Sequence, residues 1–427
     1  MVKTSIKSVK ARQILDAKGK PMLEVDVLTE AGILGRGSAP SGVSAGEHEA
    51  YVLRDKDSKW YDGLSVYKVA DIVHKTIAPK LVGMDVKDQE AIDRTMIELD
   101  GTPNKSRLGG NTLCSVSLAC IRAAAATENL PLYRYLNPAE VKTIPFPTVN
   151  CISGGSYQKG SMPFQECTVV PYKAKTIKEA VHIMYQIFQL TPTVIKDFNK
   201  GEPPKAGSLT GWQSPSQDPT VAFDIMYEAA RRIGAEDKIA FAADVAASEF
   251  YDKEKGTYDF IGENVDADAL LGFLKELTTK YPFLYVEDPL EENDWDGWKK
   301  AAKVLNRTML VGDDLTVTNI EMLKKAAKMK VCEAFIFKPN QVGTMTESIE
   351  AVEYAQSHGI LTLPSVRAGG CTDDPIFDFA VAYGCPATKQ GPPKNGERVY
   401  GINFLTRVED EHPKAKPYDF TPHIKWK

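Results

Sequence analysis

Six charged residues stand where apolar, strand-like runs of the sequence end. They are Asp244 (FAADV), Glu287 (YVEDP), Asp313 (VGDD), Lys338 (FIFKP), Arg367 (PSVR) and Lys389 (ATKQG). The successive intervals are 43, 26, 25, 29 and 22 residues, and all but the first match one strand-plus-helix unit. Because the carboxyl ends of parallel barrel strands meet at one face, this spacing predicts that the six side chains point into a common pocket.

Three of these side chains, those of Asp244, Glu287 and Asp313, are carboxylates that repel one another when they are gathered in one place. A divalent cation removes the repulsion, and oxygen ligands without nearby His or Cys favour Mg²⁺ over zinc. Any one acid is better explained as a helix cap or an ion-pair partner, but three acids at matched positions favour a metal site. The adjacent Asp288 and Asp314 are predicted to face the other way and to support the ligands.

Lys338 directly follows a buried apolar run, which is an unusual place for an ammonium group. In a dry pocket near a dication and other cations, its pKa is predicted to fall toward neutrality, so that it can act as a general base. A metal beside a substrate carboxylate stabilises the enolate that forms when an α-proton leaves. Lys389 and Arg367 would neutralise further negative charge.

The elements that must position these groups are alternating strands and helices. From about Val149 onward, short β-rich runs alternate with amphipathic stretches, which indicates parallel strands buried on both faces. This pattern fits a (β/α) barrel better than a doubly wound sheet, because no Gly-rich dinucleotide loop follows any strand. The first part of the chain is α+β, and Pro145 and Pro147 mark a boundary. We predict an N-terminal α+β capping domain over residues 1–138 and a modified TIM-type (β/α)8 barrel over residues 139–427.

Composition excludes several classes of function. The 52 Lys and Arg residues against 57 Asp and Glu residues leave a net charge of −5 without a block of like charge, which argues against nucleic acid or membrane partners. No apolar run reaches the roughly 18 residues of a membrane span, and no signal peptide is recognisable. The 7 cysteines include no CxxC pair. We therefore expect a cytoplasmic protein with reduced cysteines that acts on a small anionic molecule.

The chain resembles the enolase family along nearly its whole length. The matching stretches include ARQILDAKGKPMLEVDV, APSGVSAGEHEAYVLRD, LDGTPNKSRLGGN, YVEDP, VGDDLTVTN and KPNQVGTMTES. The resemblance implies a carbon–oxygen lyase with a capped barrel, usually a homodimer. It also implies Mg²⁺ ligation by Asp244, Glu287 and Asp313, proton abstraction by Lys338, and carboxylate contacts from Lys389.

The resemblance extends to further residues of the site. Ser41, in the PSGVSAG loop, looks like the family's second-metal ligand on a mobile lid and is also expected near the substrate. Glu166, in the FQE stretch, matches the first of two glutamates on the acid side. Its neighbour Gln165 and Tyr157 are taken as substrate contacts.

The departures from the family pattern fall on the leaving-group and phosphate side. Leu209, in GSLTG, stands where the family has its acid, and SVRAG places Val366 and Ala368 where the family has a histidine and a serine. Tyr157, in GGSY, replaces another family histidine. Loss of a general acid costs about 10²- to 10⁴-fold in rate, so 2-phosphoglycerate dehydration should be severely impaired unless Glu166 or Tyr157 substitutes.

These observations favour a Mg²⁺-dependent lyase that abstracts the proton α to a carboxylate, on a substrate related to 2-phosphoglycerate but different from it. Three alternatives stay open. They are a phosphopyruvate hydratase with a substituted acid, an enolase-fold binding protein without catalysis, and a racemase in which Lys338 and Lys389 flank one carbon.

Overall fold

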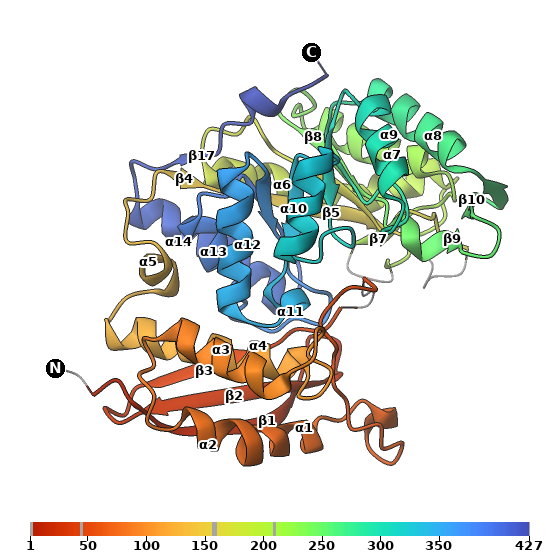
Figure 1. The fold of residues 1–427 in the computed structure, drawn as a ribbon. Coiled ribbons are helices and arrows are strands. Elements are labelled where there is room, and N and C mark those ends of the chain that lie inside the picture. The colour runs from red at the N-terminus through yellow and green to blue at the C-terminus, as the bar shows by residue number, and fades with distance from the viewer. Residues whose placement is uncertain (1–2, 43–45, 156–159, 208–210, 427) are drawn as a thin grey trace.

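The computed structural model describes residues 3–42, 46–155, 160–207 and 211–426, which form two packed parts (Figure 1). The first part is a three-stranded antiparallel sheet with helices on it, and the second is a β/α barrel. The predicted α/β fold class, with an N-terminal α+β part and a modified barrel, is therefore confirmed. Among the described residues, no helix combines the length and the apolar character that a membrane span needs.

The N-terminal sheet pairs β1 (Ile6–Leu15), β2 (Pro21–Thr29) and β3 (Leu34–Ser38) in that order. Helix α4 (Gly110–Thr127) is almost completely buried against β3. A Cβ atom on Gly35 would stand 2.1 Å from the carbonyl oxygen of Ala119, so glycine is required for this close approach. α4 ends at Thr127, Asn129 takes a φ of +55°, and α5 (Leu132–Leu136) begins after Pro131.

The barrel sheet contains nine strands within the described residues, and it is curled rather than flat. Eight of them follow the order β15-β14-β13-β12-β8-β6-β5-β16, and β7 (Trp212–Gln213) pairs with β5. An isolated parallel bridge between Ser365 and Lys389 links the two ends of this order. The strands are β5 (Phe146–Ser153), β6 (Glu166–Val170), β8 (Ala240–Asp244), β12 (Phe283–Glu287), β13 (Met309–Gly312), β14 (Ala334–Phe337), β15 (Leu361–Pro364) and β16 (Ala387–Lys389).

One strand corrects the expectation of an all-parallel barrel. β6 pairs antiparallel with both β5 and β8, whereas β8, β12, β13, β14 and β15 pair in parallel. The described residues between β5 and β6, 154–155 and 160–165, contain no helix, and a short connection permits antiparallel pairing. The first residue of β6 therefore lies at the same edge as the last residues of its neighbours.

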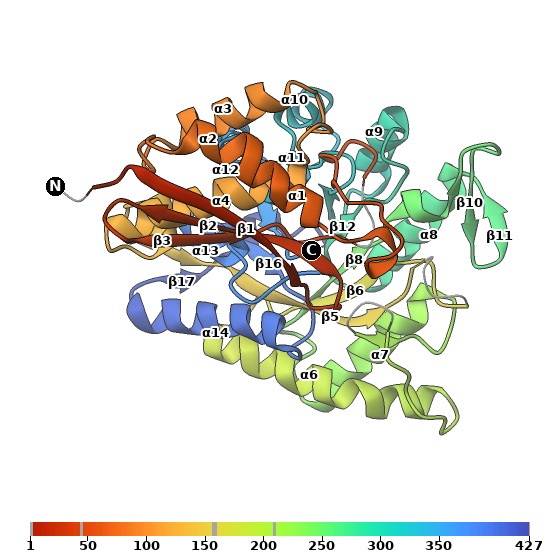
Figure 2. The ribbon, with the colours of Figure 1, turned by 90° about the horizontal axis from the view of Figure 1, so that it is seen from below.

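Helices cover the outer face of the barrel and separate its core from solvent (Figure 1). α6 and α14 lie side by side there (Figure 2). The outer helices are α6 (Ile177–Phe198), α7 (Pro219–Arg232), α8 (Ala267–Lys280), α9 (Trp295–Val304), α10 (Ile320–Met329), α12 (Met345–Ser357), α13 (Ile376–Ala382) and α14 (Gly396–Glu411). The short α11 (Pro339–Val342) lies instead at the end of the barrel that meets the N-terminal part.

The N-terminal part is fastened to the barrel by apolar and polar contacts. Side chains of α4, including Leu118 and Ile121, share one apolar cluster with Phe335 and Phe337 of β14. On α3 (Gln89–Asp100), the carboxylate of Asp93 accepts hydrogen bonds from the N–H and the hydroxyl of Thr346, at 2.9 and 2.7 Å. The N-terminal part is thus packed directly against the barrel.

Candidate active site

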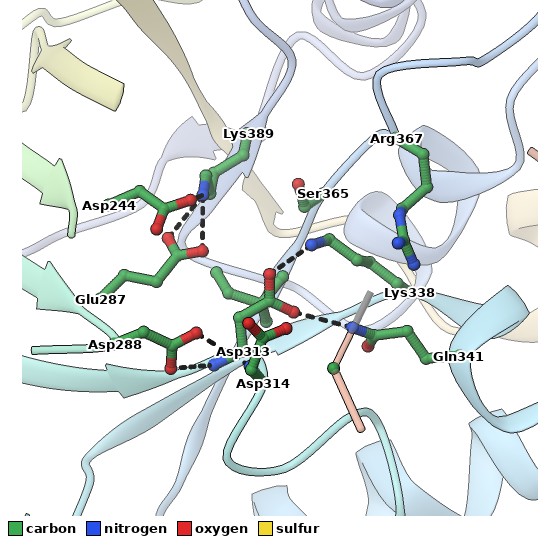
Figure 3. Close-up of polar contacts among 12 residues, drawn as sticks. Asp244, Glu287, Asp288, Asp313, Asp314, Lys338, Gln341, Ser365, Arg367 and Lys389 are labelled. Atoms are coloured by element: carbon green, nitrogen blue, oxygen red, sulfur yellow. Dashed lines mark hydrogen bonds and ion pairs between the residues drawn. The ribbon is translucent and has the colours of Figure 1, made fainter. Parts of the chain in front are cut away.

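The strand-end residues lie together at one face of the barrel (Figure 3). Asp244, Glu287 and Lys389 are the last residues of β8, β12 and β16. Asp313 and Lys338 come directly after β13 and β14. The strand register explains the convergence, because the ends of neighbouring parallel strands lie level with one another.

Lys389 lies between the first two carboxylates. Its Nζ is 2.7 and 2.5 Å from the two carboxylate oxygens of Glu287 and 3.1 Å from Oδ2 of Asp244. Burial opposes the charge of this ammonium, but Asp244 and Glu287 outweigh burial and raise the pKa of Lys389 well above its usual range. The two carboxylates therefore favour the charged form of Lys389.

Lys338 pairs with the third carboxylate. Its Nζ donates to Oδ2 of Asp313, and both side chains are nearly buried. Burial lowers the pKa of Lys338, but the charge of Asp313 raises it, and the net direction is upward. This direction corrects the expectation of a lowered pKa. Arg367 and Lys389 do act to lower it, as expected, but the close carboxylate prevails.

The pKa values of Glu287 and Asp313 are shifted in opposite directions. Burial raises the pKa of Glu287 well above its usual range, and the nearby charge of Asp244 adds to this effect. Burial acts in the same direction on Asp313, but Lys338 outweighs it and leaves the pKa of Asp313 lowered. The donor set consists of oxygens alone, held at 6%, 0% and 7% exposure for Asp244, Glu287 and Asp313. The ligand atoms are those that a hard divalent cation prefers. In the described part of the chain, however, these three carboxylates do not bring oxygens within 4.8 Å of one another; Asp313 does so with Asp288 and Asp314.

The neighbouring acids form a second layer. Oxygens of Asp288, Asp313 and Asp314 all lie within 4.8 Å of one another, a spacing that could hold a metal ion. The Asp288 carboxylate also accepts hydrogen bonds from the backbone N–H groups of Asp313 and Asp314, both at 2.9 Å. Asp288 therefore orients the loop that carries Asp313. The expectation that Asp288 and Asp314 face away from Asp313 is wrong, because their oxygens approach it.

Arg367 lies on the same side of the group as Lys338, away from Lys389 (Figure 3). One of its Nη atoms donates to Oε2 of Glu49 at 3.0 Å, and its carbonyl oxygen accepts from Arg398 at 3.0 Å. Glu49 belongs to the N-terminal part of the chain, 318 positions away. Sequence reasoning missed Glu49, because no local pattern marks a contact over such a separation.

Gln341 is a second residue that sequence reasoning missed. It lies on α11, three positions after Lys338, and its Nε2 donates to Oδ1 of Asp313 at 2.9 Å. The sequence could have indicated Gln341, because a polar residue in the first helical turn after a strand-end lysine lies at the same rim of the barrel. The KPNQVGT stretch contains it.

The structure describes some of the residues expected on the acid side, Glu166 and Gln165, but not all of them. The carboxylate of Glu166 lies 3.6 Å from Nζ of Lys389 and faces the pocket from the first position of β6. Gln165 joins the barrel through its backbone, with its N–H donating to the carbonyl of Asp244 at 3.0 Å. Tyr157 and Leu209 lie outside the described residues.

Ser41 lies at the joint between the two parts of the chain. Among the described residues, its hydroxyl donates to Asp16 at 3.2 Å, and its backbone exchanges hydrogen bonds with Gly369. The structure therefore places Ser41 beside the loop after Arg367, without a hydrogen bond to any of the three acids. Val366, in the same loop, donates its N–H to the carbonyl of Lys389 at 3.0 Å.

This fold, with acids and ammonium groups gathered at the strand ends, defines a capped β/α-barrel protein. Comparison with protein families agrees. The family model "Enolase, N-terminal domain" matches residues 6–136, and the model "Enolase, C-terminal TIM barrel domain" matches residues 141–425. The chain belongs to the enolase family and is an enolase-like lyase.

Proposed function

We propose that this protein is a Mg²⁺-dependent lyase that removes the proton α to a carboxylate, on a substrate related to 2-phosphoglycerate but different from it. One observation carries the proposal. Lys338 and Lys389 approach from different strands, and each is paired with acids of one oxygen-rich group, Asp313 on one side and Asp244 with Glu287 on the other. Opposed ammonium groups around a metal-binding carboxylate set suit the formation of an enolate.

In this proposal Asp244, Glu287 and Asp313 would hold Mg²⁺. When bound, the ion would neutralise Asp313 and supply positive charge for the dianionic enolate. Lys338 accepts the α-proton at Nζ, because burial then dominates its pKa. Lys389 stays charged and binds the substrate carboxylate, and Arg367 binds a second polar or anionic group.

The acid-side role falls to Glu166. Its side chain is partly exposed and faces Lys389, so it can reach a leaving group at the pocket and still be held by a neighbouring charge. Tyr157 and Ser41 are proposed as further contacts of the substrate or of a second metal ion. The partners we propose are a small carboxylate substrate and a second copy of the chain in a homodimer, in the cytoplasm.

The test uses the purified protein with Mg²⁺ and a panel of 2-hydroxy and 2-phospho carboxylic acids in deuterated water. We expect deuterium to enter the α-position of at least one acid, followed by loss of its β-substituent. If no acid exchanges its α-proton, the lyase proposal fails and an enolase-fold binding protein is favoured.

A second candidate is phosphopyruvate hydratase, and the position of Glu166 favours it. A carboxylate at the rim of the pocket could substitute for the acid that the family has at position 209. Rapid formation of phosphoenolpyruvate from 2-phosphoglycerate would establish this activity and refute the shifted substrate. Inversion of product chirality without elimination would instead indicate a racemase.

A further inference from the structure

Residues 46–50 of the N-terminal part dock on the barrel beside the candidate site. The N–H of Ala50 donates to the carbonyl of Gln341 at 2.7 Å, and the N–H of Glu47 donates to Oε2 of Glu292 at 2.9 Å. The ring of His48 lies 2.8 Å from Oδ1 of Asn293. Backbone and side chains together hold this segment against two parts of the barrel, the loop between β12 and α9 and the short helix α11.

Glu49 is the residue of this segment that enters the pocket. Its carboxylate and the guanidinium of Arg367 are 6% and 4% exposed, and 3.0 Å separates them. Two buried charges of opposite sign depend strongly on each other, since removal of one leaves the other uncompensated. The remaining oxygen of Glu49 accepts from Nε2 of Gln341 at 3.3 Å and from the N–H of Gly46 at 3.3 Å.

Gln341 links Glu49 to Asp313 by hydrogen bonds. The same Nε2 donates to Oδ1 of Asp313 at 2.9 Å, and Oε1 accepts from the hydroxyl of Thr318 at 2.9 Å. The Thr318 hydroxyl oxygen in turn accepts from the backbone N–H of Lys338 at 2.9 Å. An amide whose donors and acceptor are all used has one orientation, so Gln341 fixes how Asp313 is presented.

From this chain of contacts we propose that Glu49 is a positioning residue. It holds Arg367 in the orientation that binds the second group of the substrate, and through Gln341 it couples the docked N-terminal segment to Asp313. The roles of Arg367 and Asp313 rest on the proposed function. The active site is thus completed by a carboxylate from the other part of the chain.

The decisive variant is Glu49→Gln, tested with inorganic phosphate as the probe of Arg367. Calorimetric titration of the Mg²⁺-loaded protein should show phosphate binding weakened by roughly tenfold, the lower end of the effect of losing a supporting residue. Electrostatics alone predicts the opposite, because the substitution removes one negative charge from the surroundings of Arg367. Weaker binding therefore reports lost positioning, and unchanged or tighter binding overturns the proposal.

Glu47→Gln is the matched control. Glu47 lies on the same segment and loses the same charge, but its side chain is 55% exposed and pairs with Lys253 at the surface. We expect no change in phosphate affinity. If Glu49→Gln does not fold, Glu49→Asp keeps the charge and shortens the reach, and it should still weaken phosphate binding; unchanged binding would again overturn the proposal.

A second measurement tests the link to Asp313. Gln341→Leu keeps the size of the side chain but removes its donors, and we expect roughly tenfold weaker binding of Mg²⁺ alone. Unchanged Mg²⁺ affinity would overturn the coupling through Gln341. If the wild-type protein itself binds no Mg²⁺, the proposed function fails, which is a different result from a wild-type protein that binds Mg²⁺ and tolerates both substitutions.

Discussion

Glu166 and Asp244 stand directly opposite each other in the antiparallel pairing of β6 and β8. Glu166 is the first residue of β6 and Asp244 is the last residue of β8, so both lie at the same rim of the barrel. The reversed direction of β6 is the reason that a residue at the start of a strand belongs to a site built from strand ends.

Glu166→Gln should separate proton removal from loss of the leaving group. The amide keeps the shape of the side chain but cannot donate an acidic proton, so elimination should fall by about 10²- to 10⁴-fold while α-proton exchange continues. Parallel measurement of deuterium incorporation and product formation checks this. Equal losses in both rates would assign Glu166 to binding and not to the acid step.

Lys338→Ala should abolish the exchange of the substrate α-proton with solvent. Removal of a general base typically costs about 10²- to 10⁴-fold, and Asp313 also loses its ion-pair partner. Exchange is followed by NMR in deuterated water. Lys324→Ala removes a surface lysine that pairs with Glu321 and should leave exchange unaltered. Normal exchange in the Lys338 variant would contradict the assignment of the base.

Addition of Mg²⁺ should raise the thermal unfolding temperature of the wild-type protein. A ligand present at 100 times its dissociation constant stabilises the native state by about 2.7 kcal/mol. Asp313→Asn removes a proposed ligand and should abolish most of this stabilisation, as measured by scanning calorimetry with and without Mg²⁺. Glu291→Gln is the control. It also replaces a carboxylate by an amide, but Glu291 is not a proposed ligand and its carboxylate accepts hydrogen bonds from Asn293. An equal Mg²⁺ effect in all three proteins would exclude Asp313 as a ligand.

Asp374 should make the protein less stable as pH rises from about 4 to about 6. Burial raises the pKa of this carboxyl from 3.8 to about 6, so the folded state holds a proton that the unfolded chain has already released. The stability that this proton provides is complete below pH 4 and is lost as pH rises through about 6. A shift of about two units corresponds to roughly 3 kcal/mol.

Asp374→Asn should remove this pH dependence, because the amide does not titrate and can still accept the hydrogen bond from the N–H of Ile376. Urea unfolding at several pH values measures the difference. Between pH 4 and pH 7, the free energy of unfolding of the wild type should fall relative to that of the variant by up to about 3 kcal/mol. Parallel pH profiles would show that Asp374 titrates normally.

Gly35→Ala should destabilise the N-terminal part by about 1–3 kcal/mol, because its new methyl group would overlap the backbone of α4. Gly272→Ala is the matched control. Gly272 lies in α8, where a Cβ atom meets no atom within 4 Å, and alanine should stabilise this helix by about 1 kcal/mol. Chemical denaturation compares the two variants. Equal stability of the Gly35 variant and the wild type would contradict the close packing of β3 on α4.

The barrel and most of its strand-end groups could be predicted from sequence because they are local features. A strand buried on both faces reads as a short apolar run, and the first polar residue after it must stand at the rim. Lys338 after FIF and Asp313 after VG follow this rule. The same rule assumes that all strands run in one direction, so it could not explain why Glu166, at the start of β6, reaches the pocket.

The sequence by itself determined the family, the alternation of strands and helices, and the acids and lysines at the strand ends. Tertiary structure decided the direction of β6, the pairing of Glu49 with Arg367, and the sign of the pKa shift of Lys338. The physical reason is distance. Apolar periodicity is written into neighbouring residues, whereas hydrogen bonds and Coulomb energies depend on separations in space between residues that are far apart in the chain.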